Sequence, residues 1–427
     1  MKRTAILLIL IALSGCIARP PAMGEAEKVI LENGMTLIVK ENRANDIVAV
    51  EVFVKTGAWT EPEGETGIRN FVGKMLLKGT KKRSARDIAF ESEAVGVTLS
   101  TDIGNDYTEI TMKSTGEFFE EGMEILADII TNSIFAPDEI EKERGIILEE
   151  IKAQEDNAFQ NIHALFLKTL YGEHPYGKSL IGDAEAVKVM DRESLLGYYG
   201  KYYVPNNIVV AIVGNVEAER AISVVEDQFK GFEYGEIPKR PEIEAEISET
   251  YGSEEKEREQ SYIMVGYLCA DIKSEDYPVL KVINSILGEG SSSRLFVELR
   301  EKRGLAYEVV SFFPSRMDRS YIVAFIGTTP ENEKEVISGI EEEFDSLKEE
   351  LVTEEELERA KKRLAGNYVM RHESNKGQAR YLAFFESLGV GYGYDERYIE
   401  EVEGVTQEDI QRVARKYFEK PVVVVVG

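Results

Sequence analysis

The sequence predicts an α+β protein of two similar domains, each a mostly antiparallel sheet with helices packed on one face. The chain has 427 residues, of which 43% are hydrophobic, so it can form two domains with substantial cores. Runs with a period of two residues occur in clusters beside amphipathic helical segments, which favours sheets covered by helices. A third observation, an internal repeat, indicates that the domain occurs twice.

The repeat consists of a helix followed by a strand. Residues 190–214, MDRESLLGYYGKYYVPNNIVVAIVG, contain a helix-period segment, a Lys-aromatic-aromatic step, a turn signal and a β-branched run that ends at Gly214. Residues 405–427, VTQEDIQRVARKYFEKPVVVVVG, repeat these features in the same order and end at Gly427. We interpret the two segments as copies of one domain's last elements; the alternative is a chance likeness between two αβ packings.

The repeat places the domains at residues 25–235 and 259–427. Residues 236–258 between them carry two prolines, many carboxylates and few large apolar residues, which is typical of a linker, although the alternation at Ile243 and Ile247 would also suit an edge strand. Period-two runs predict strands at 48–54, 108–112, 262–267 and 321–325, and the β-branched runs at 208–213 and 422–426 predict a strand at the end of each repeat. Helical periodicity predicts helices at 118–132 and 334–349.

The N-terminus has the pattern of an export signal. Residues 1–16, MKRTAILLILIALSGC, begin with two cations, continue with a short apolar run and end with small residues. The apolar run is shorter than the roughly 20 residues that span a bilayer. The ending resembles a bacterial lipobox, so we expect Cys16 to be lipidated and the protein to be an exported, membrane-anchored lipoprotein on the periplasmic or cell-surface side. An ordinary signal peptide is the alternative.

The charge and the residue counts exclude several classes of function. Lys and Arg number 51 against 78 Asp and Glu, and the resulting net charge of −27 would repel the phosphate backbone of a nucleic acid. Two cysteines cannot form a disulfide framework or a Cys-rich zinc site. Three histidines, the first at His163, leave no metal site built mainly from histidine.

One stretch of the first domain resembles a known family. Residues 56–82, TGAWTEPEGETGIRNFVGKMLLKGTKK, resemble the zinc motif of the M16 metallopeptidases, the group of pitrilysin, insulinase and the mitochondrial processing peptidase, whose pattern is G-x-A-H-F-x-E-H-M-x-F-K-G-T. The resemblance implies the M16/LuxS-like metallohydrolase fold and extends over about residues 28–427. Within the motif, Asn70 and Lys74 stand at the two His positions and Gly73 stands at the Glu position.

These replacements remove the chemistry of the motif. Histidines at positions i and i+4 share one helix face and can bind one zinc, while the Glu at i+3 holds the attacking water. Asn70 is a poor zinc ligand, Gly73 offers no base, and Lys74 brings a positive charge to the place of a dication. The resemblance therefore implies a zinc-less chain that binds no cofactor of its own and is not a zinc peptidase on its own.

Two acidic positions of the family's site are kept. The resemblance maps the third zinc ligand to Glu150, with Glu143 as its companion, whereas the adjacent Glu149 is the competing assignment. The alternative is that these carboxylates are solvated acids on a Glu-rich helix. Because a partly buried carboxylate without a cation is costly, we predict an ion pair between Lys74 and Glu150 or Glu143.

The second domain keeps a different part of the family pattern. Residues 287–310, LGEGSSSRLFVELREKRGLAYEVV, resemble the stretch in which an Arg and a Tyr bind substrate backbone and the developing oxyanion, and these map to Arg300 and Tyr307. The alternatives are an exposed helix charge and a strand-packing aromatic. The family's edge strand, which pairs with extended substrate, maps to about residues 99–104, where Ser100 and Thr101 replace an Asn-Ala pair.

Together these features predict a substrate-binding subunit. Small family members pair face to face, and some pairs divide zinc and the Arg/Tyr pair between two chains. We expect a zinc-bearing sibling subunit as partner, with zinc in that partner and a peptide or unfolded polypeptide as substrate. The membrane would be contacted by the lipid anchor only, and no nucleic acid is expected. The alternative is a catalytically inert scaffold or peptide-binding homologue.

Overall fold

The computed structural model describes residues 24–256 and 260–427. Cys16 and the predicted export signal lie outside the described residues. Within the described ranges, no helix combines the length and the apolar character that a membrane span needs.

The first domain is built on a six-stranded sheet with the order β1-β2-β6-β3-β5-β4. Neighbouring strands are antiparallel except β2 and β6, which run parallel. The strands are β1 (Glu27–Ile30), β2 (Thr36–Glu41), β3 (Ile47–Val54), β4 (Thr98–Ile103), β5 (Thr108–Thr115) and β6 (Ile208–Gly214). The helices are α1 (Ile68–Met75), α2 (Ala85–Ala94), α3 (Phe119–Thr131), α4 (Pro137–Asp156), α5 (Ala158–Tyr171), α6 (Ala184–Val189), α7 (Arg192–Tyr202) and α8 (Ala218–Gln228).

The second domain is built on a five-stranded sheet with the order β7-β11-β8-β10-β9. Its strands are β7 (Tyr251–Glu254), β8 (Ser261–Leu268), β9 (Glu308–Phe312), β10 (Tyr321–Thr328) and β11 (Val422–Val426). A π-helix covers Phe296–Lys302, and the α-helices are α9 (Tyr277–Gly288), α10 (Glu333–Glu349), α11 (Glu354–Arg371), α12 (Asn375–Ser387), α13 (Tyr394–Glu403) and α14 (Gln407–Tyr417).

The two sheets share one topology. The order β7-β11-β8-β10-β9 corresponds strand by strand to β2-β6-β3-β5-β4, and in each sheet the first of these pairs is parallel. The predicted repetition of one α+β domain is therefore confirmed. One strand, β7, lies inside the segment predicted as a linker, because the free edge of β11 gives Tyr251–Glu254 a hydrogen-bonding partner. The part at 236–250 contains neither helix nor strand.

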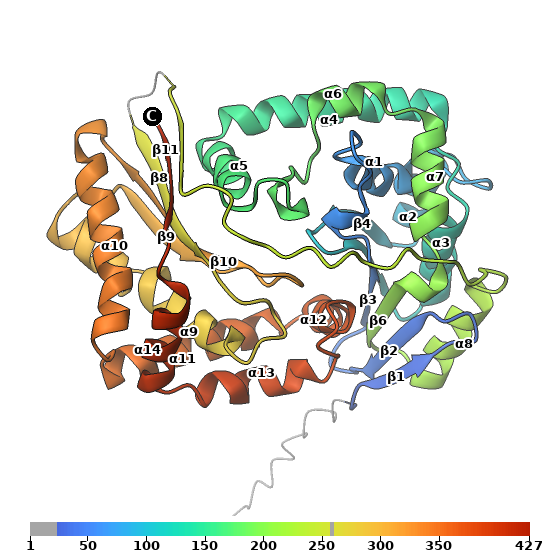
Figure 1. Cartoon of the computed structure of the whole chain (residues 1–427). Coiled ribbons are helices and arrows are strands. Elements are labelled where there is room, and N and C mark those ends of the chain that lie inside the picture. Colours follow the sequence, from blue (N-terminus) through green and yellow to red (C-terminus); the bar gives the residue numbers. More distant parts are fainter. Residues whose placement is uncertain (1–23, 257–259) are drawn as a thin grey trace, which may run out of the picture.

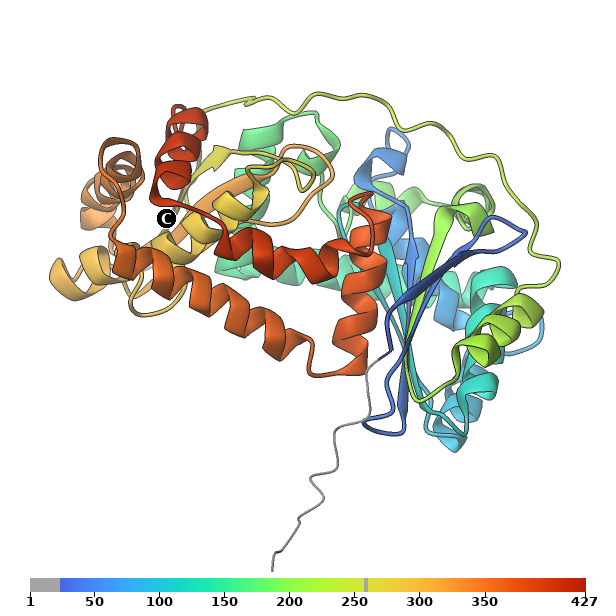
Figure 2. The ribbon, with the colours of Figure 1, turned by 90° about the horizontal axis from the view of Figure 1, so that it is seen from below.

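Both faces of each sheet are covered, and the second face is covered by the other domain. Strand β6 shows the alternation: Val210 and Ile212 pack into the core under the first domain's own helices, whereas Val209 and Ala211 pack into the core of the second domain. Helix α12 of the second domain lies against β3 and β6 of the first sheet, and helix α5 of the first domain lies against β8 and β11 of the second sheet (Figures 1 and 2). Strands buried on both faces become nearly continuous apolar runs, as β6 is.

Polar groups fix α12 on the first sheet. The Asn375 side chain donates to the carbonyl oxygen of Ile47 at 2.7 Å and accepts a hydrogen bond from Asn42 at 2.7 Å. The Arg380 guanidinium lies 3.1 Å from a carboxylate oxygen of Glu109 on β5. The two domains are therefore joined by a packed and hydrogen-bonded junction.

Candidate functional site

Helix α1 carries the degenerate motif and is tightly anchored. Its N-cap, Gly67, has a φ of 99°, and a Cβ there would lie 2.4 Å from the Cα of Gly182, so only glycine fits this close approach. The buried Arg69 forms an ion pair with Glu61 at 3.1 Å and donates to the carbonyl oxygen of Gly104 at 2.7 Å. These bonds hold α1 beside the end of β4.

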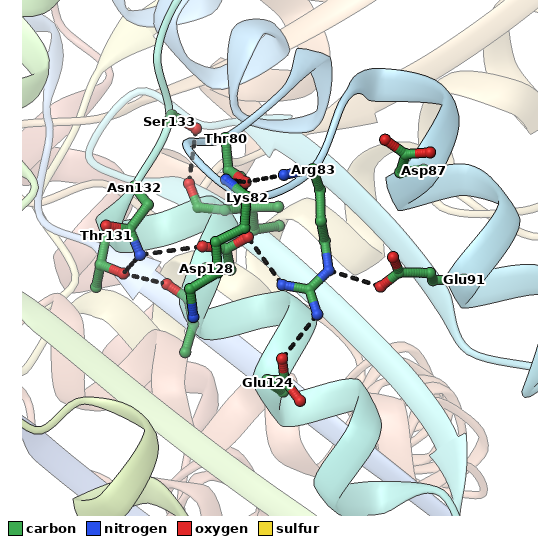
Figure 3. A network of polar contacts seen from close by, with 12 residues as sticks. Thr80, Lys82, Arg83, Asp87, Glu91, Glu124, Asp128, Thr131, Asn132 and Ser133 are labelled. Atoms are coloured by element: carbon green, nitrogen blue, oxygen red, sulfur yellow. Dashed lines mark hydrogen bonds and ion pairs between the residues drawn. The ribbon is translucent and has the colours of Figure 1, made fainter.

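A polar network holds the turn that follows α1 (Figure 3). Thr80 donates to Asp128 of α3 at 2.6 Å, and Arg83 lies 2.9 Å from the same carboxylate. Arg83 also contacts Glu91 at 2.6 Å and Glu124 at 2.7 Å, so one guanidinium ties the turn to α2 and α3. The turn therefore fixes the C-terminal end of α1, which carries Lys74, and the short 3₁₀ helix Leu76–Lys78 that follows it.

The predicted ion pair of Lys74 is present. The ammonium nitrogen of Lys74 lies 2.8 Å from Glu150 Oε1 and 3.7 Å from Glu143 Oε1, both on α4. Lys78 lies one helix turn further on and reaches the other oxygen of Glu143 at 2.9 Å. The Glu143 side chain is only 4% exposed, whereas Glu149, the competing assignment, points outward and is exposed. Two lysines thus neutralise two carboxylates at the place that the motif assigns to a metal.

The other two motif positions are also filled by local contacts. Asn70 is buried, and its side-chain amide donates to the carbonyl oxygen of Ile181 at 3.0 Å. At Gly73, the Cδ1 atom of Ile103 lies 2.7 Å from where a Cβ would stand, so the Ile103 side chain occupies the space beside the glycine. Asn70 and Gly73 are therefore both in contact with other parts of the first domain.

A divalent metal does not fit this group of residues. A zinc site needs several neutral or anionic donors around one point, but here the Lys74 ammonium lies between the two carboxylates. Within residues 24–256 and 260–427, no three His, Cys, Asp or Glu side chains are placed to hold one ion.

A cavity of about 570 Å³ lies beside this group. Strand β4 forms one wall, and it is the last strand of its sheet, so its outer edge is free of strand partners within the described chain. Ser100 is exposed and Thr101 is half-buried along this edge, and both line the cavity together with Asn70 and Lys74. The loop at Leu180 and Ile181 forms another wall and also borders an adjoining cleft of about 840 Å³.

The adjoining cleft was not predicted from the sequence. It is lined by α5, the loop at 177–184, β7 and the buried Arg316 of the second domain. His163 also lines it and bonds to the hydroxyl of Tyr321 at 2.6 Å, and burial lowers the pKa of His163 to about 4. The stretch EHPYGKSLIGD supplies the loop, but only the fold brings that loop to α1 and β4.

Arg300 and Tyr307 lie in the second domain, away from the cavity beside Lys74. Arg300 is exposed on the π-helix, with its guanidinium 5.0 Å from the ring centroid of Phe296, and Tyr307 is 59% exposed just before β9. Neither residue lines the cavity that contains Lys74. Strand β9 is the edge of the second sheet, as β4 is of the first. Within one chain, the two predicted halves of a site are not brought together.

Known proteins resemble the chain over nearly its whole length. Residues 36–184 match the domain Insulinase (Peptidase family M16), and residues 190–364 match the Peptidase M16 inactive domain. The uncharacterized zinc protease YmxG of Bacillus subtilis is 30% identical over 390 residues, which cover 91% of this chain and 94% of the relative. An uncharacterized zinc protease of Rickettsia felis is 30% identical over 395 residues, with coverage of 91% and 94%.

Solved structures share the fold. A protease from Helicobacter pylori aligns with a TM-score of 0.87 at 22% identity, covering 95% of this chain and 100% of that one. A peptidase M16 inactive domain from Pseudomonas fluorescens aligns with a TM-score of 0.85 at 23% identity, covering 94% and 98%. Because models of this family match residues 36–184 and 190–364 and the Bacillus relative is 30% identical over 91% of this chain, the chain belongs to peptidase family M16.

Proposed function

We propose that the chain is the zinc-less, substrate-binding subunit of a heterodimeric M16 peptidase, and that Arg300 and Tyr307 complete the zinc site of a sibling subunit. The observation that carries this proposal is a contrast between the two domains. In the first domain, Lys74 is bonded to Glu150 at the motif's metal position. In the second, Arg300 and Tyr307 are intact and exposed.

The bonding of Lys74 supports the first half of the proposal. Lys74 and Lys78 satisfy Glu143, a carboxylate that would be costly to bury alone. A zinc ion would have to displace the Lys74 ammonium and then bind beside the cationic Lys78, with no imidazole to complete its coordination. The carboxylates at this position are therefore neutralised without a metal, and we expect zinc in the partner.

The exposure of Arg300 and Tyr307 supports the second half. Within the described ranges, Arg300 forms no ion pair, so its planar set of donors is free for an external acceptor. Tyr307 also presents most of its side chain to solvent. An Arg and a Tyr hydroxyl can donate to a peptide carbonyl and to the oxyanion that forms on it, which is how such residues would serve a partner's zinc site.

The free edge of β4 suggests how the substrate binds. An extended peptide can add to an edge strand through main-chain hydrogen bonds, with alternate side chains entering the wall of the cavity. Ser100 and Thr101 lie on this edge and leave its backbone unobstructed by a large side chain. We propose that a peptide or unfolded polypeptide binds here.

The proposal also includes the location of the protein. The lipobox-like ending at Cys16 supports an exported lipoprotein on the periplasmic or cell-surface side, held to the membrane by acyl chains. Metabolic labelling with a fatty acid should mark the wild-type protein and leave Cys16→Ala unlabelled. Equal labelling of both would contradict the anchor.

The central experiment measures peptide hydrolysis by the chain, by a sibling with an intact His-x-x-Glu-His motif, and by the mixture. We expect turnover in the mixture only, with zinc carried by the sibling. Arg300→Ala and Tyr307→Phe should each lower kcat by about 100-fold, the typical cost of losing one oxyanion donor. Lys302→Ala removes another exposed cation from the same π-helix and is the matched control. Unchanged turnover in the Arg300 and Tyr307 variants would favour the scaffold alternative.

A further inference from the structure

The second domain encloses a cavity that lies apart from the site described above. Its volume is about 270 Å³, and it lies among helices α9, α11, α12 and α13 and strand β9. It shares no lining residue with the cavity beside Lys74. Aromatic rings make up much of its wall: Tyr277, Phe312, Phe313, Tyr368, Tyr381, Phe384, Phe385 and Tyr398.

A lysine ammonium projects into this aromatic cavity. Lys281 of α9 donates to the carbonyl oxygen of Phe313 at 2.7 Å and lies 5.1 Å from the ring centroids of both Tyr277 and Phe313. Burial lowers the pKa of Lys281 to about 8, so the amine is still mostly protonated at neutral pH. An ammonium has three donors, and two of those on Lys281 lack a hydrogen-bond acceptor in the described chain.

A carboxylate in the same cavity is also only half satisfied. Glu289 accepts a hydrogen bond from the Asn284 amide at 2.9 Å through Oε1, while its Oε2 is buried and has no partner. Arg371 lies in the wall as well and bonds through Nη1 to the Tyr381 hydroxyl at 3.2 Å. Within residues 24–256 and 260–427, Glu289 forms no ion pair within 4.0 Å with Lys281 or Arg371. Its negative charge nevertheless opposes the effect of burial on the pKa of Lys281.

Two cations, Lys281 and Arg371, and one anion, Glu289, therefore line one cavity without an ion pair between them. Buried charges are stabilised by pairing and by full hydrogen bonding, and an unsatisfied carboxylate oxygen is costly. A molecule that carries both an anion and a cation would satisfy both ends at once. The aromatic wall adds a preference for a ring between or beside the two charges.

We propose that this cavity binds a free aromatic α-amino acid, whose carboxylate contacts Lys281 and Arg371 and whose ammonium contacts Glu289. The size agrees with this class of ligand, because a cavity of about 150 Å³ holds a benzene molecule and the remaining volume suits an amino-acid backbone. The proposal is independent of the peptidase partnership, because it uses none of the residues of the candidate site.

Isothermal titration of the purified chain with four small molecules tests the proposal without any mutation. L-phenylalanine has all three recognition elements, 3-phenylpropionate lacks the ammonium, L-phenylalaninamide lacks the carboxylate, and L-alanine lacks the ring. We expect L-phenylalanine to bind and each of the others to bind at least about tenfold more weakly, because each leaves a charge or the aromatic wall unpaired. Absence of phenylalanine binding, with water alone filling the cavity, would overturn the proposal, and so would equal binding of the zwitterion and its analogues.

Two variants then assign the ends of the ligand. Glu289→Gln should weaken L-phenylalanine at least about tenfold while leaving 3-phenylpropionate unchanged, because the latter has no ammonium. Lys281→Met should weaken both. Glu275→Gln, an exposed glutamate just before α9, is the matched control. A purely structural role for Glu289 would weaken both ligands alike, and that result would contradict the assignment.

Discussion

Replacing Glu51 by glutamine should remove a pH dependence from the stability of the domain junction. Glu51 is a fully buried residue of β3, and it accepts hydrogen bonds from Thr111 at 2.9 and 3.1 Å. It faces Glu109 of β5, and Lys376 and Arg380 of α12 contribute positive charge. Burial and the charge of Glu109 raise the pKa of Glu51 from 4.5 to about 8. The neutral acid is therefore the form that the folded chain prefers.

The direction of the effect follows from proton binding. Between pH 4.5 and about pH 8 the folded chain keeps the Glu51 proton and the unfolded chain releases it, so the free energy of unfolding falls as the pH rises. The stabilisation is fully present below pH 4.5 and is lost above about pH 8. With about 1.4 kcal/mol for each pKa unit, Glu51 alone should lower the free energy of unfolding by roughly 4 kcal/mol between pH 5 and pH 9.

Urea unfolding of the wild type and of Glu51→Gln across this pH range measures the effect. The difference between the two proteins is the informative quantity, because other groups titrate in the same range. For example, His163 has a pKa lowered to about 4 by burial, which makes the free energy of unfolding rise with pH. The glutamine variant should equal or exceed the stability of the wild type at pH 9, and its relative stability should decline toward pH 5.

Glu219→Gln is the control, because it removes one exposed carboxylate of α8 without contact to the junction. A constant difference between wild type and Glu51→Gln from pH 5 to pH 9 would refute the reasoning. It would mean that Glu51 titrates similarly in the folded and unfolded chains.

Two further predictions concern the anchoring of α1 and the junction between the domains. Gly67→Ala should destabilise the protein by about 1–3 kcal/mol in urea unfolding, because its Cβ would clash with the backbone of Gly182 and the φ is positive. Gly145→Ala on α4, where no atom lies within 4 Å, should instead stabilise by up to about 1 kcal/mol; equal effects would contradict the packing argument. Arg380→Met should cost about 1–3 kcal/mol by leaving Glu109 buried without its cation, and a neutral outcome would show that the ion pair does not hold the junction.

The parts of the fold that the sequence predicts are those encoded by local patterns. Period-two runs predict β3, β5, β8 and β10, and continuous β-branched runs predict β6 and β11. The repeat between residues 190–214 and 405–427 predicts that the two domains share one topology. The Lys74–Glu150 ion pair is predictable because the spacing of the family's zinc motif identifies both residues. Strand β7 is harder to assign, because its residues gain a regular structure only through pairing with β11.

The packing of α5 and α12 on the sheet of the other domain is not predictable in the same way. An amphipathic pattern identifies a helix and its apolar face, but it does not say which sheet that face will cover. The same limit applies to Glu51, because Glu109 is brought near it by the pairing of β3 with β5 and Arg380 reaches it only across the junction. The aromatic cavity is likewise lined by residues of β9 and four helices, so no single sequence motif predicts it.

The contacts of the degenerate motif explain why one substitution should not restore a metal site. Lys74→His alone would leave Glu143 with Lys78 and Glu150 without a cation, and it would still lack the other ligand and the base. A glutamate at Gly73 would have to displace the Ile103 side chain from the space that it fills. Each replaced position thus contacts other groups of the same chain, so recovery of zinc binding requires changes at several positions together. This mutual dependence agrees with the proposal that the zinc lies in a sibling subunit.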